Sequence, residues 1–175
     1  ELHGEKELMC GILGVASASG IPIPPETIEK MRDAMAHRGP DDTGIYTDPY
    51  VTLAHRRLSI IDLGGGHQPM SNPAKTIQVI HNGEIYNFLD VRRELEAEGF
   101  SFQTKSDTEV IVRAYEKWGL DCAEKLHGIF AFAVWDAPRK RLFLARDRLG
   151  IKPLFYATTP RRFYFASEIK ALLED

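Results

Sequence analysis

The sequence predicts an α+β fold with largely antiparallel sheets and helices packed on the outside. Strand-like and helix-like segments segregate along the chain rather than alternate, which disfavours a doubly wound parallel sheet. Short polar turns such as DAPR at 136–139 favour hairpins. With 175 residues, 43% of them hydrophobic, the chain is long enough to form one domain with a full core.

The first half of the chain contains one buried strand, one helix and two further strands. The small apolar run CGILGVAS at 10–17 suits a buried strand. Pro24 and Pro25 open a helix that Gly39 closes. The apolar face of this helix carries Ile28, Met31 and Met35. Two alternating stretches are expected as strands, 50–58 and 76–81.

Two helices and a strand-rich run make up the second half. Asn87 can cap a helix that ends at Gly99, and Phe88, Val91 and Leu95 share a face of it. Ser106 and Glu109 have the spacing of a capping box at the start of the next helix, which Gly119 ends. The remaining elements are expected as strands at 128–136, 140–146, 153–157 and 162–166, and a short helix at 167–173.

Composition excludes several classes of protein. The balance of 22 Lys and Arg against 25 Asp and Glu gives a charge of −3, which argues against nucleic acid as a partner. The longest apolar run, 128–135, is far short of the ~20 residues of a membrane span, so no membrane partner is expected. Residues 1–9 are polar and show no signal peptide. Two cysteines build no disulfide framework, which favours a cytoplasmic setting.

Three features that suggest chemistry have simpler interpretations. The glycine run 64–66 lacks the rest of a phosphate-binding motif and is better read as a mobile turn. The six histidines show no ligand spacing, so no metal is expected. Cys122 lies among helical residues and is most simply a buried small hydrophobic side chain.

The candidate chemistry gathers around Cys10 and three polar segments. Asn82 and Gly83 follow an apolar strand, where a side-chain amide and a backbone N–H could converge on an oxyanion; a plain Asn-Gly turn is the alternative. Arg57 ends another strand and could clasp a carboxylate, or be a solvated surface charge. Asp107 begins a helix, where a carboxylate can cap it or bind an ammonium group.

Taken together, these residues resemble the class II glutamine amidotransferase domains. The match begins with MCGILGV at 9–15 and covers essentially 10–175, so we expect one domain there, with 1–9 an extension that is a tag, leader or propeptide. Among members of this class, the chain is most similar to the glutaminase domain of glutamine-hydrolysing asparagine synthetases. The other matching segments are HRGPDDTG (37–44), LAHRRLSIIDL (53–63), GHQPM (66–70), NGEIYN (82–87), SDTEV (106–110), GIFAFAVWD (128–136), ARDRLGIKPLFY (145–156) and FASEIKAL (165–172).

This resemblance implies a fold and a set of roles. The fold is that of N-terminal-nucleophile hydrolases, a four-layer αββα sandwich with two antiparallel sheets. Cys10 resembles the nucleophile that attacks the glutamine side-chain amide and forms a γ-glutamyl thioester. Asn82 and Gly83 match the oxyanion donors, and Arg57 and Asp107 match the residues that bind the α-carboxylate and α-ammonium groups. Positions matching the wall of the glutamine pocket are Leu58, Ser59, Ile60, Ile61 and Glu84.

The base that activates Cys10 depends on the chain terminus. In the family the initiator Met is removed and the free amine of the Cys, with an ordinary pKa of about 7.7–8.0, is the natural base. Here nine residues precede Cys10, so its nitrogen is an amide unless they are removed. His81 is the alternative base.

The resemblance also implies partners. Ammonia would normally pass to an ATP-dependent, amide-forming synthetase domain fused after this one, where ATP and Mg would be bound; this domain needs no cofactor. The phosphate motif of that domain does not occur in the sequence. L-glutamine is the expected substrate and a homodimer is an open alternative. Two competing functions remain: a non-catalytic glutamine-binding or docking domain with Cys10 blocked, and a glutamine sensor without turnover.

Overall fold

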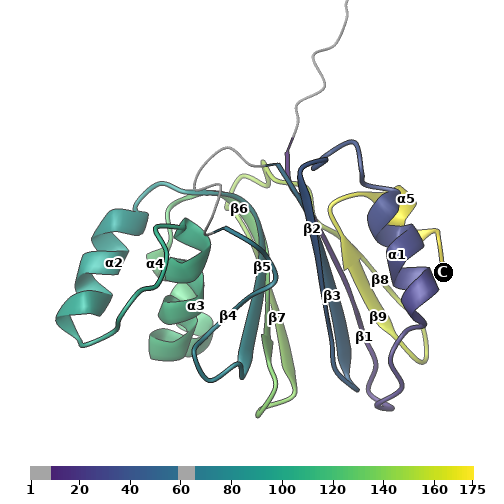
Figure 1. Ribbon diagram of the computed structural model, residues 1–175, viewed down its shortest axis with the longest axis horizontal. Helices are drawn as coiled ribbons and strands as arrows, with labels where there is room; N and C mark the ends of the chain where they lie inside the picture. Colours follow the sequence, from purple (N-terminus) through teal and green to yellow (C-terminus); the bar gives the residue numbers. More distant parts are fainter. Residues whose placement is uncertain (1–8, 59–65) are drawn as a thin grey trace, which may run out of the picture.

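A computed structural model describes residues 9–58 and 66–175. Two antiparallel sheets pack face to face, and helices cover the outer face of each, so the molecule has four layers (Figure 1). The expected α+β class and the αββα arrangement are therefore confirmed. The N-terminal end of β1 lies at the upper end of the sandwich, between the two sheets.

One sheet has five strands and the other has four. The first sheet has the order β2-β3-β1-β9-β8, with β1 Gly11–Ala16, β2 Asp42–Thr47, β3 Val51–Arg57, β8 Phe155–Thr158 and β9 Phe163–Ala166. The second has the order β4-β5-β6-β7, with β4 Met70–Ser71, β5 Ile77–Ile85, β6 Gly128–Asp136 and β7 Arg141–Arg146. The expected hairpin at 136–139 joins β6 to β7, which pair from Asp136 with Arg141 onward.

The helices divide between the two outer layers. The five-stranded sheet is covered by α1 Pro25–Asp33 and α5 Ile169–Leu172. The four-stranded sheet is covered by α2 Phe88–Ala97, α3 Asp107–Trp118, the 3-10 helix η1 Gly119–Asp121 and α4 Cys122–Lys125. No helix of the described residues is both long and apolar enough to cross a membrane.

Three apolar clusters hold the layers together. Ile12, Leu53, Ile80 and Phe165 lie in the cluster between the sheets. A second cluster packs α1 and α5 on the first sheet, and a third packs α2, α3 and α4 on the second. Strands β1 and β6 are buried along most of their length, so their sequences read as nearly continuous hydrophobic segments rather than strict alternations.

The first helix is shorter than expected. It ends at Asp33, and residues 34–38 continue as tight turns, although Ile28, Met31 and Met35 are all buried as predicted. Gly39 does not end the helix. A β-carbon on Gly39 would lie 2.5–2.6 Å from backbone atoms of Arg56 and Arg57, so this glycine allows the chain to cross closely over β3.

Strand β5 is longer than expected and contains Asn82 and Gly83. The prediction that these residues lie at a strand end was wrong, as was the alternative of a hairpin turn. Asn82 pairs with Ala131 and Gly83 with Phe130 in the ladder with β6. Strands β2 and β4 were not predicted; β4 has only two residues and β2 follows Gly39 after a short turn.

The two predicted helix caps differ in detail from expectation. Asn87 stands before α2 but makes no capping bond; its side chain bonds to the backbone of Lys125 and His127 instead. Ser106 caps α3 by accepting from the Thr108 N–H at 3.2 Å. Glu109 does not complete the box, because its carboxylate accepts from Gln103 and Thr104 in the preceding loop.

Candidate active site

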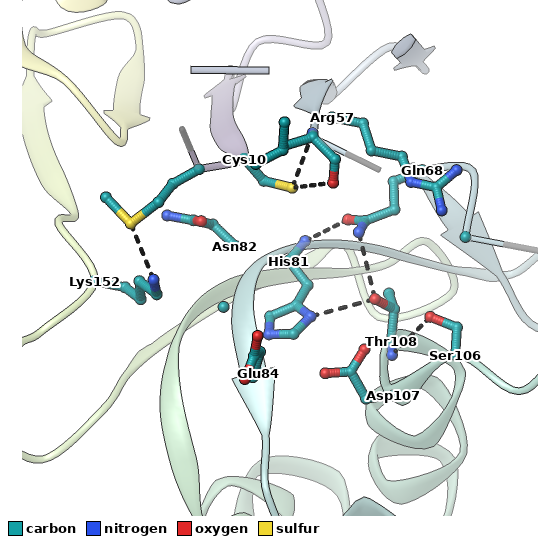
Figure 2. A pocket seen from close by; sticks show the side chains of 14 residues that line it. Cys10, Arg57, Gln68, His81, Asn82, Glu84, Ser106, Asp107, Thr108 and Lys152 are labelled. Atoms are coloured by element: carbon teal, nitrogen blue, oxygen red, sulfur yellow. Dashed lines mark hydrogen bonds between the residues drawn. The ribbon is translucent and has the colours of Figure 1, made fainter. Parts of the chain in front are cut away.

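The candidate residues meet in one pocket between the upper ends of the two sheets. Its cavity volume is about 120 Å³, and Figure 2 shows the side chains that surround it. The five-stranded sheet supplies the residues directly before β1 and the end of β3. The four-stranded sheet supplies β5, and the start of α3 lies beside it. The lining residues are Met9, Cys10, Arg57, Leu58, Gly66, Gln68, His81, Asn82, Gly83, Glu84, Ser106, Asp107, Thr108 and Lys152.

Cys10 stands directly before β1, at the entrance to the inter-sheet space. Its Sγ accepts from the Leu58 N–H at 3.4 Å and lies 3.8 Å from the Leu58 carbonyl oxygen. Burial raises the pKa of the thiol, while the bond to Leu58 and the charges of Arg57, Arg38 and Lys152 act in the opposite direction. The net shift is upward, so the thiol is protonated near neutral pH and needs a base to become a nucleophile.

Arg38 positions the main chain at Cys10. Its Nε donates to the Cys10 carbonyl oxygen at 3.1 Å, and its Nη1 donates to Glu168 at 3.2 Å. Glu168 also pairs with His37 at 2.7 Å and Lys170 at 3.1 Å. Sequence reasoning did not single out Arg38, although it lies in the HRGPDDTG segment. Its burial, with 8% of its surface exposed, is seen only in the structure.

Arg57 occupies the last position of β3 and is buried, with 7% of its surface exposed. The alternative of a solvated surface charge was therefore wrong. Gly66 packs against the guanidinium: a β-carbon there would lie 2.3 Å from Arg57 Nη2. The side chain presents a planar donor group to one wall of the pocket (Figure 2).

Asn82 presents an unsatisfied donor. The residue is 1% exposed, and among the residues that the structure describes its Nδ2 has no hydrogen-bond partner. A buried unpaired donor costs about 1–3 kcal/mol, so a site that retains one is suited to a ligand acceptor. Next to it, Gly83 has φ +138°, and a β-carbon would lie 2.0 Å from the Ile129 carbonyl oxygen. Only glycine fits this position of the strand.

His81 lies where the short β4 leaves the edge of β5 uncovered. Two side chains satisfy its backbone there: the His81 N–H donates to Gln68 Oε1 at 2.6 Å, and His55 Nε2 lies 3.1 Å from its carbonyl oxygen. Burial lowers the pKa of His81. Among the described residues, no histidine nitrogen forms a hydrogen bond with Cys10 Sγ.

Asp107 is the first residue of α3, across the pocket from Cys10. Its Oδ2 accepts from the Ile85 N–H at 3.0 Å, which fixes the carboxylate between the end of β5 and the helix. The N-terminal end of a helix favours this negative charge. Glu84 is exposed and lines the same side of the pocket.

The pocket thus contains Cys10, Arg57, Leu58, Asn82, Gly83, Glu84 and Asp107. Ser59, Ile60 and Ile61, also expected to line it, lie outside the described residues. Gln68, Thr108 and Lys152 were missed. The matching segments GHQPM, SDTEV and ARDRLGIKPLFY contain all three, but no periodicity in the sequence indicates that they meet. Among the described residues, no group of three or more His, Cys, Asp or Glu is placed to hold a metal ion.

Comparisons with known proteins agree with this geometry. The family model described as "Glutamine amidotransferase domain" matches residues 9–175. Asparagine synthetase [glutamine-hydrolyzing] 3 of Bacillus subtilis (strain 168) is 47% identical over 94% of this chain and 27% of its own length. Asparagine synthetase B of Escherichia coli (strain K12) is 41% identical over 94% of this chain and 30% of its own length. The chain spans about a quarter to a third of these relatives.

Solved structures share the fold. Glutamine phosphoribosylpyrophosphate amidotransferase from B. subtilis, complexed with ADP and GMP, superposes with a TM-score of 0.76 at 20% identity, over 93% of this chain and 43% of that one. A structure titled as the allosteric regulatory enzyme of purine biosynthesis gives 0.77 at 22% identity, over 94% and 43%. This chain belongs to the family of glutamine amidotransferase domains.

Proposed function

We propose that this domain hydrolyses the side-chain amide of L-glutamine to glutamate and ammonia. One observation carries the proposal: a single pocket contains a thiol, an unpartnered buried amide donor, an arginine and an aspartate. Glutamine is a zwitterion with a neutral side-chain amide. It therefore needs an anion-binding group and a cation-binding group at one end, and a nucleophile with oxyanion donors at the other.

Each group has a role in this reaction. Arg57 binds the α-carboxylate and Asp107 the α-ammonium group. Cys10 Sγ attacks the side-chain carbonyl carbon, and Asn82 Nδ2 with the Gly83 N–H stabilises the oxyanion. The C–N bond then breaks, ammonia leaves with the proton taken from the thiol, and a γ-glutamyl thioester remains. Water hydrolyses the thioester and releases glutamate.

The base in this scheme is the α-amine of Cys10. The thiol is protonated near neutral pH, and Cys10 Sγ has Leu58 as its hydrogen-bond partner rather than a histidine. A terminal amine is the base nearest to Sγ, since both belong to one residue. In the 175-residue chain, however, Cys10 follows Met9 and its nitrogen is an amide. We infer that activity requires removal of residues 1–9.

The experiment compares two forms of the protein. One is the 175-residue chain and the other begins at Cys10; each is checked by intact-mass spectrometry and assayed for ammonia release from glutamine. Hydrolysis by the shorter form alone supports both the activity and the terminal-amine base. Full activity with residues 1–9 in place would reject that base. Failure of both folded forms to hydrolyse glutamine would reject the activity and favour a binding or sensing domain.

The second part of the proposal concerns how a longer protein would use the ammonia. The relatives named as asparagine synthetases are roughly three to four times longer than this chain. We infer that ammonia made here passes to a fused amide-forming synthetase domain, and that ATP and Mg act there. The identity of the carboxylate that receives the ammonia belongs to that domain. A longer form of the protein tests this step. It should make its amide product with glutamine as the nitrogen source as well as with added ammonia.

A further inference from the structure

His81 is held at three points by residues from three different segments. Gln68 Oε1 accepts from its backbone N–H at 2.6 Å, and His55 Nε2 contacts its carbonyl oxygen at 3.1 Å. Its ring Nδ1 lies 3.2 Å from Thr108 Oγ1. Figure 2 shows the ring directed toward the start of α3, between the strand and Thr108. The ring Nε2 is buried and has no partner within the described ranges 9–58 and 66–175.

These contacts fix the direction of two of the hydrogen bonds. A backbone N–H can only donate, so the amide oxygen of Gln68 faces His81 and its Nε2 faces Thr108 Oγ1, at 3.3 Å. Thr108 Oγ1 therefore accepts from Gln68. Of the described residues, His81 Nδ1 is the one acceptor recorded for its hydroxyl proton. If Thr108 donates to Nδ1, the ring carries its own proton on Nε2.

We propose that Gln68 and Thr108 form a hydrogen-bond relay that holds His81 as the Nε2–H tautomer, and that this relay positions Asn82 for catalysis. His81 is then a positioning residue rather than a base. This inference rests on the proposed glutamine hydrolysis only for its effect on rate. The proposed tautomer is argued from the contacts of the relay and does not depend on that function.

The relay is linked to the reaction through the position of His81 next to Asn82 in β5. Asn82 directly follows His81, and its Nδ2 is the unpartnered donor proposed for the oxyanion. Clamping the N–H and C=O of His81 fixes the strand at the residue before that donor. A donor held in place before the reaction stabilises the oxyanion without reorganisation. Loosening the clamp should therefore lower kcat more than it raises KM.

A neutral His81 ring also leaves the negative charge of Asp107 available to the substrate's ammonium group. Asp107 and Glu84 favour the charged imidazolium and Lys152 opposes it, while burial lowers the pKa of His81 overall. A neutral His81 does not compete with the substrate's ammonium group for Asp107. The relay supports this state, because a Thr108 hydroxyl that donates to Nδ1 occupies the position a second ring proton would take.

Nitrogen-15 NMR of the histidine-labelled protein tests the tautomer directly. His81→Gln identifies the signals of His81 by their loss. We expect an unprotonated Nδ1 and a protonated Nε2 at neutral pH. Thr108→Val removes the hydroxyl at nearly constant shape and should abolish the tautomer preference, whereas Thr108→Ser should retain it. Thr52→Val is the matched control, because it removes a buried hydroxyl of β3 that has no partner in the described part of the chain.

Gln68→Glu gives the sharpest result. The introduced carboxylate still accepts from the His81 N–H, but it now accepts from Thr108 as well. Thr108 must then accept from the ring, so His81 should change to the Nδ1–H tautomer.

The kinetic test uses Thr108→Val in the chain beginning at Cys10. The kcat for glutamine hydrolysis should fall roughly three- to tenfold, the equivalent of one lost neutral hydrogen bond, with little change in KM.

The outcomes separate the relay from the proposed hydrolysis. A wild-type ring with Nδ1–H or with both nitrogens protonated at neutral pH overturns the relay. So does an unchanged tautomer in both Thr108→Val and Gln68→Glu. If wild type shows the expected tautomer and no glutamine hydrolysis, the relay stands and the proposed function fails. An equal loss of kcat in Thr52→Val would show a merely structural effect and remove the positioning role.

Discussion

The two cysteines of this chain occupy opposite kinds of surroundings. Cys122 starts α4 within the apolar cluster that joins the helices to the four-stranded sheet, and burial raises its pKa to about 12. Cys10 stands at the end of β1, half-buried, and burial raises its pKa as well. At Cys10 the charges of Arg57, Arg38 and Lys152 oppose this rise in pKa, whereas at Cys122 the charge of Asp121 adds to it.

The difference teaches that burial alone does not distinguish a nucleophile from a structural thiol. What distinguishes Cys10 is its position between two sheets, where other chain segments bring donors and charges to the same cavity. Cys122 instead packs within the apolar cluster of the helices and is not among the residues that line the pocket. Substitutions at the two sites, and at the groups around Cys10, should therefore separate effects on activity from effects on stability.

The largest effect is expected at the two thiols themselves. Cys10→Ala should reduce glutamine hydrolysis by ~10³-fold or more, because it removes the attacking atom. Cys122→Ala should leave hydrolysis unchanged and lower the free energy of unfolding by about 1 kcal/mol, because it leaves a small cavity in the core. Ammonia release and denaturant unfolding measure the two quantities on the chain beginning at Cys10.

Chemical labelling gives the control for this pair. A glutamine-like electrophile should add its mass to Cys10 and leave Cys122 unmodified in the folded protein. Peptide mapping by mass spectrometry locates the adduct. Modification of Cys122 with Cys10 untouched would contradict the assignment.

Arg57 should show the next largest effect. Arg57→Lys keeps the charge but loses the planar pair of donors, so KM for glutamine should rise about 10- to 100-fold. Arg56→Lys is a matched control, since Arg56 pairs with Asp33 rather than lining the pocket. Steady-state kinetics on both variants provides the measurement. Equal KM values would place Arg57 outside the substrate site.

Asp107→Asn tests the opposite end of the same substrate. The amide oxygen can still accept from the Ile85 N–H, so the helix start is retained while the charge is lost. KM should rise about tenfold with a smaller change in kcat, because a charge-assisted bond to the ammonium group becomes neutral. Circular dichroism checks the helix. A fall in stability with unchanged KM would mean that Asp107 only stabilises the start of α3.

Most of the fold followed from local pattern. The apolar runs that became β1, β3, β6, β7 and β9 lie within one or two residues of their expected bounds. The misses have nonlocal causes. The helix opened by Pro25 ends at Asp33, and Gly39 then passes close over β3. Strand β5 continues through Asn82 because it pairs with β6 along its whole length. Strand β4 is too short to produce any periodicity.

The site was less accessible to reasoning from single segments. An Asn-Gly pair reads as a turn until its ladder partners are known, and an Arg at a strand end reads as exposed until Gly66 is seen to cover it. Gln68 and Thr108 could not have been predicted, because their role depends on the backbone groups that the two-residue β4 leaves uncovered. Family resemblance brought the segments together before the structure did.

Gly66→Ala should have a smaller effect than the changes at Arg57. The added methyl group would lie 2.3 Å from Arg57 Nη2, so the guanidinium must move. Because the far end of a long side chain can shift, we expect KM to rise roughly three- to tenfold with little loss of stability. Kinetics and thermal unfolding on one sample separate the two. An unchanged KM would show that the guanidinium tolerates displacement.

The smallest effect on activity, and a clear one on stability, is expected at His55. This ring is buried beside the pocket, between the two sheets, and burial lowers its pKa to about 3. The unfolded chain binds a proton near pH 6.5 and the folded chain does not, so stability is full above pH 6.5 and falls as pH decreases toward 3. His55 alone should contribute a slope of up to about 1.4 kcal/mol per pH unit in that range. His81 adds to this slope in the same direction, because its pKa is also lowered.

His55→Gln retains a donor for the His81 carbonyl, so it should flatten the slope without abolishing it. Glutamine hydrolysis near neutral pH should stay within about twofold of the unsubstituted protein. Urea unfolding at a series of pH values measures the slope. An identical slope in the variant would mean that His55 is protonated in the folded protein, and that its bond to His81 does not depend on a neutral ring.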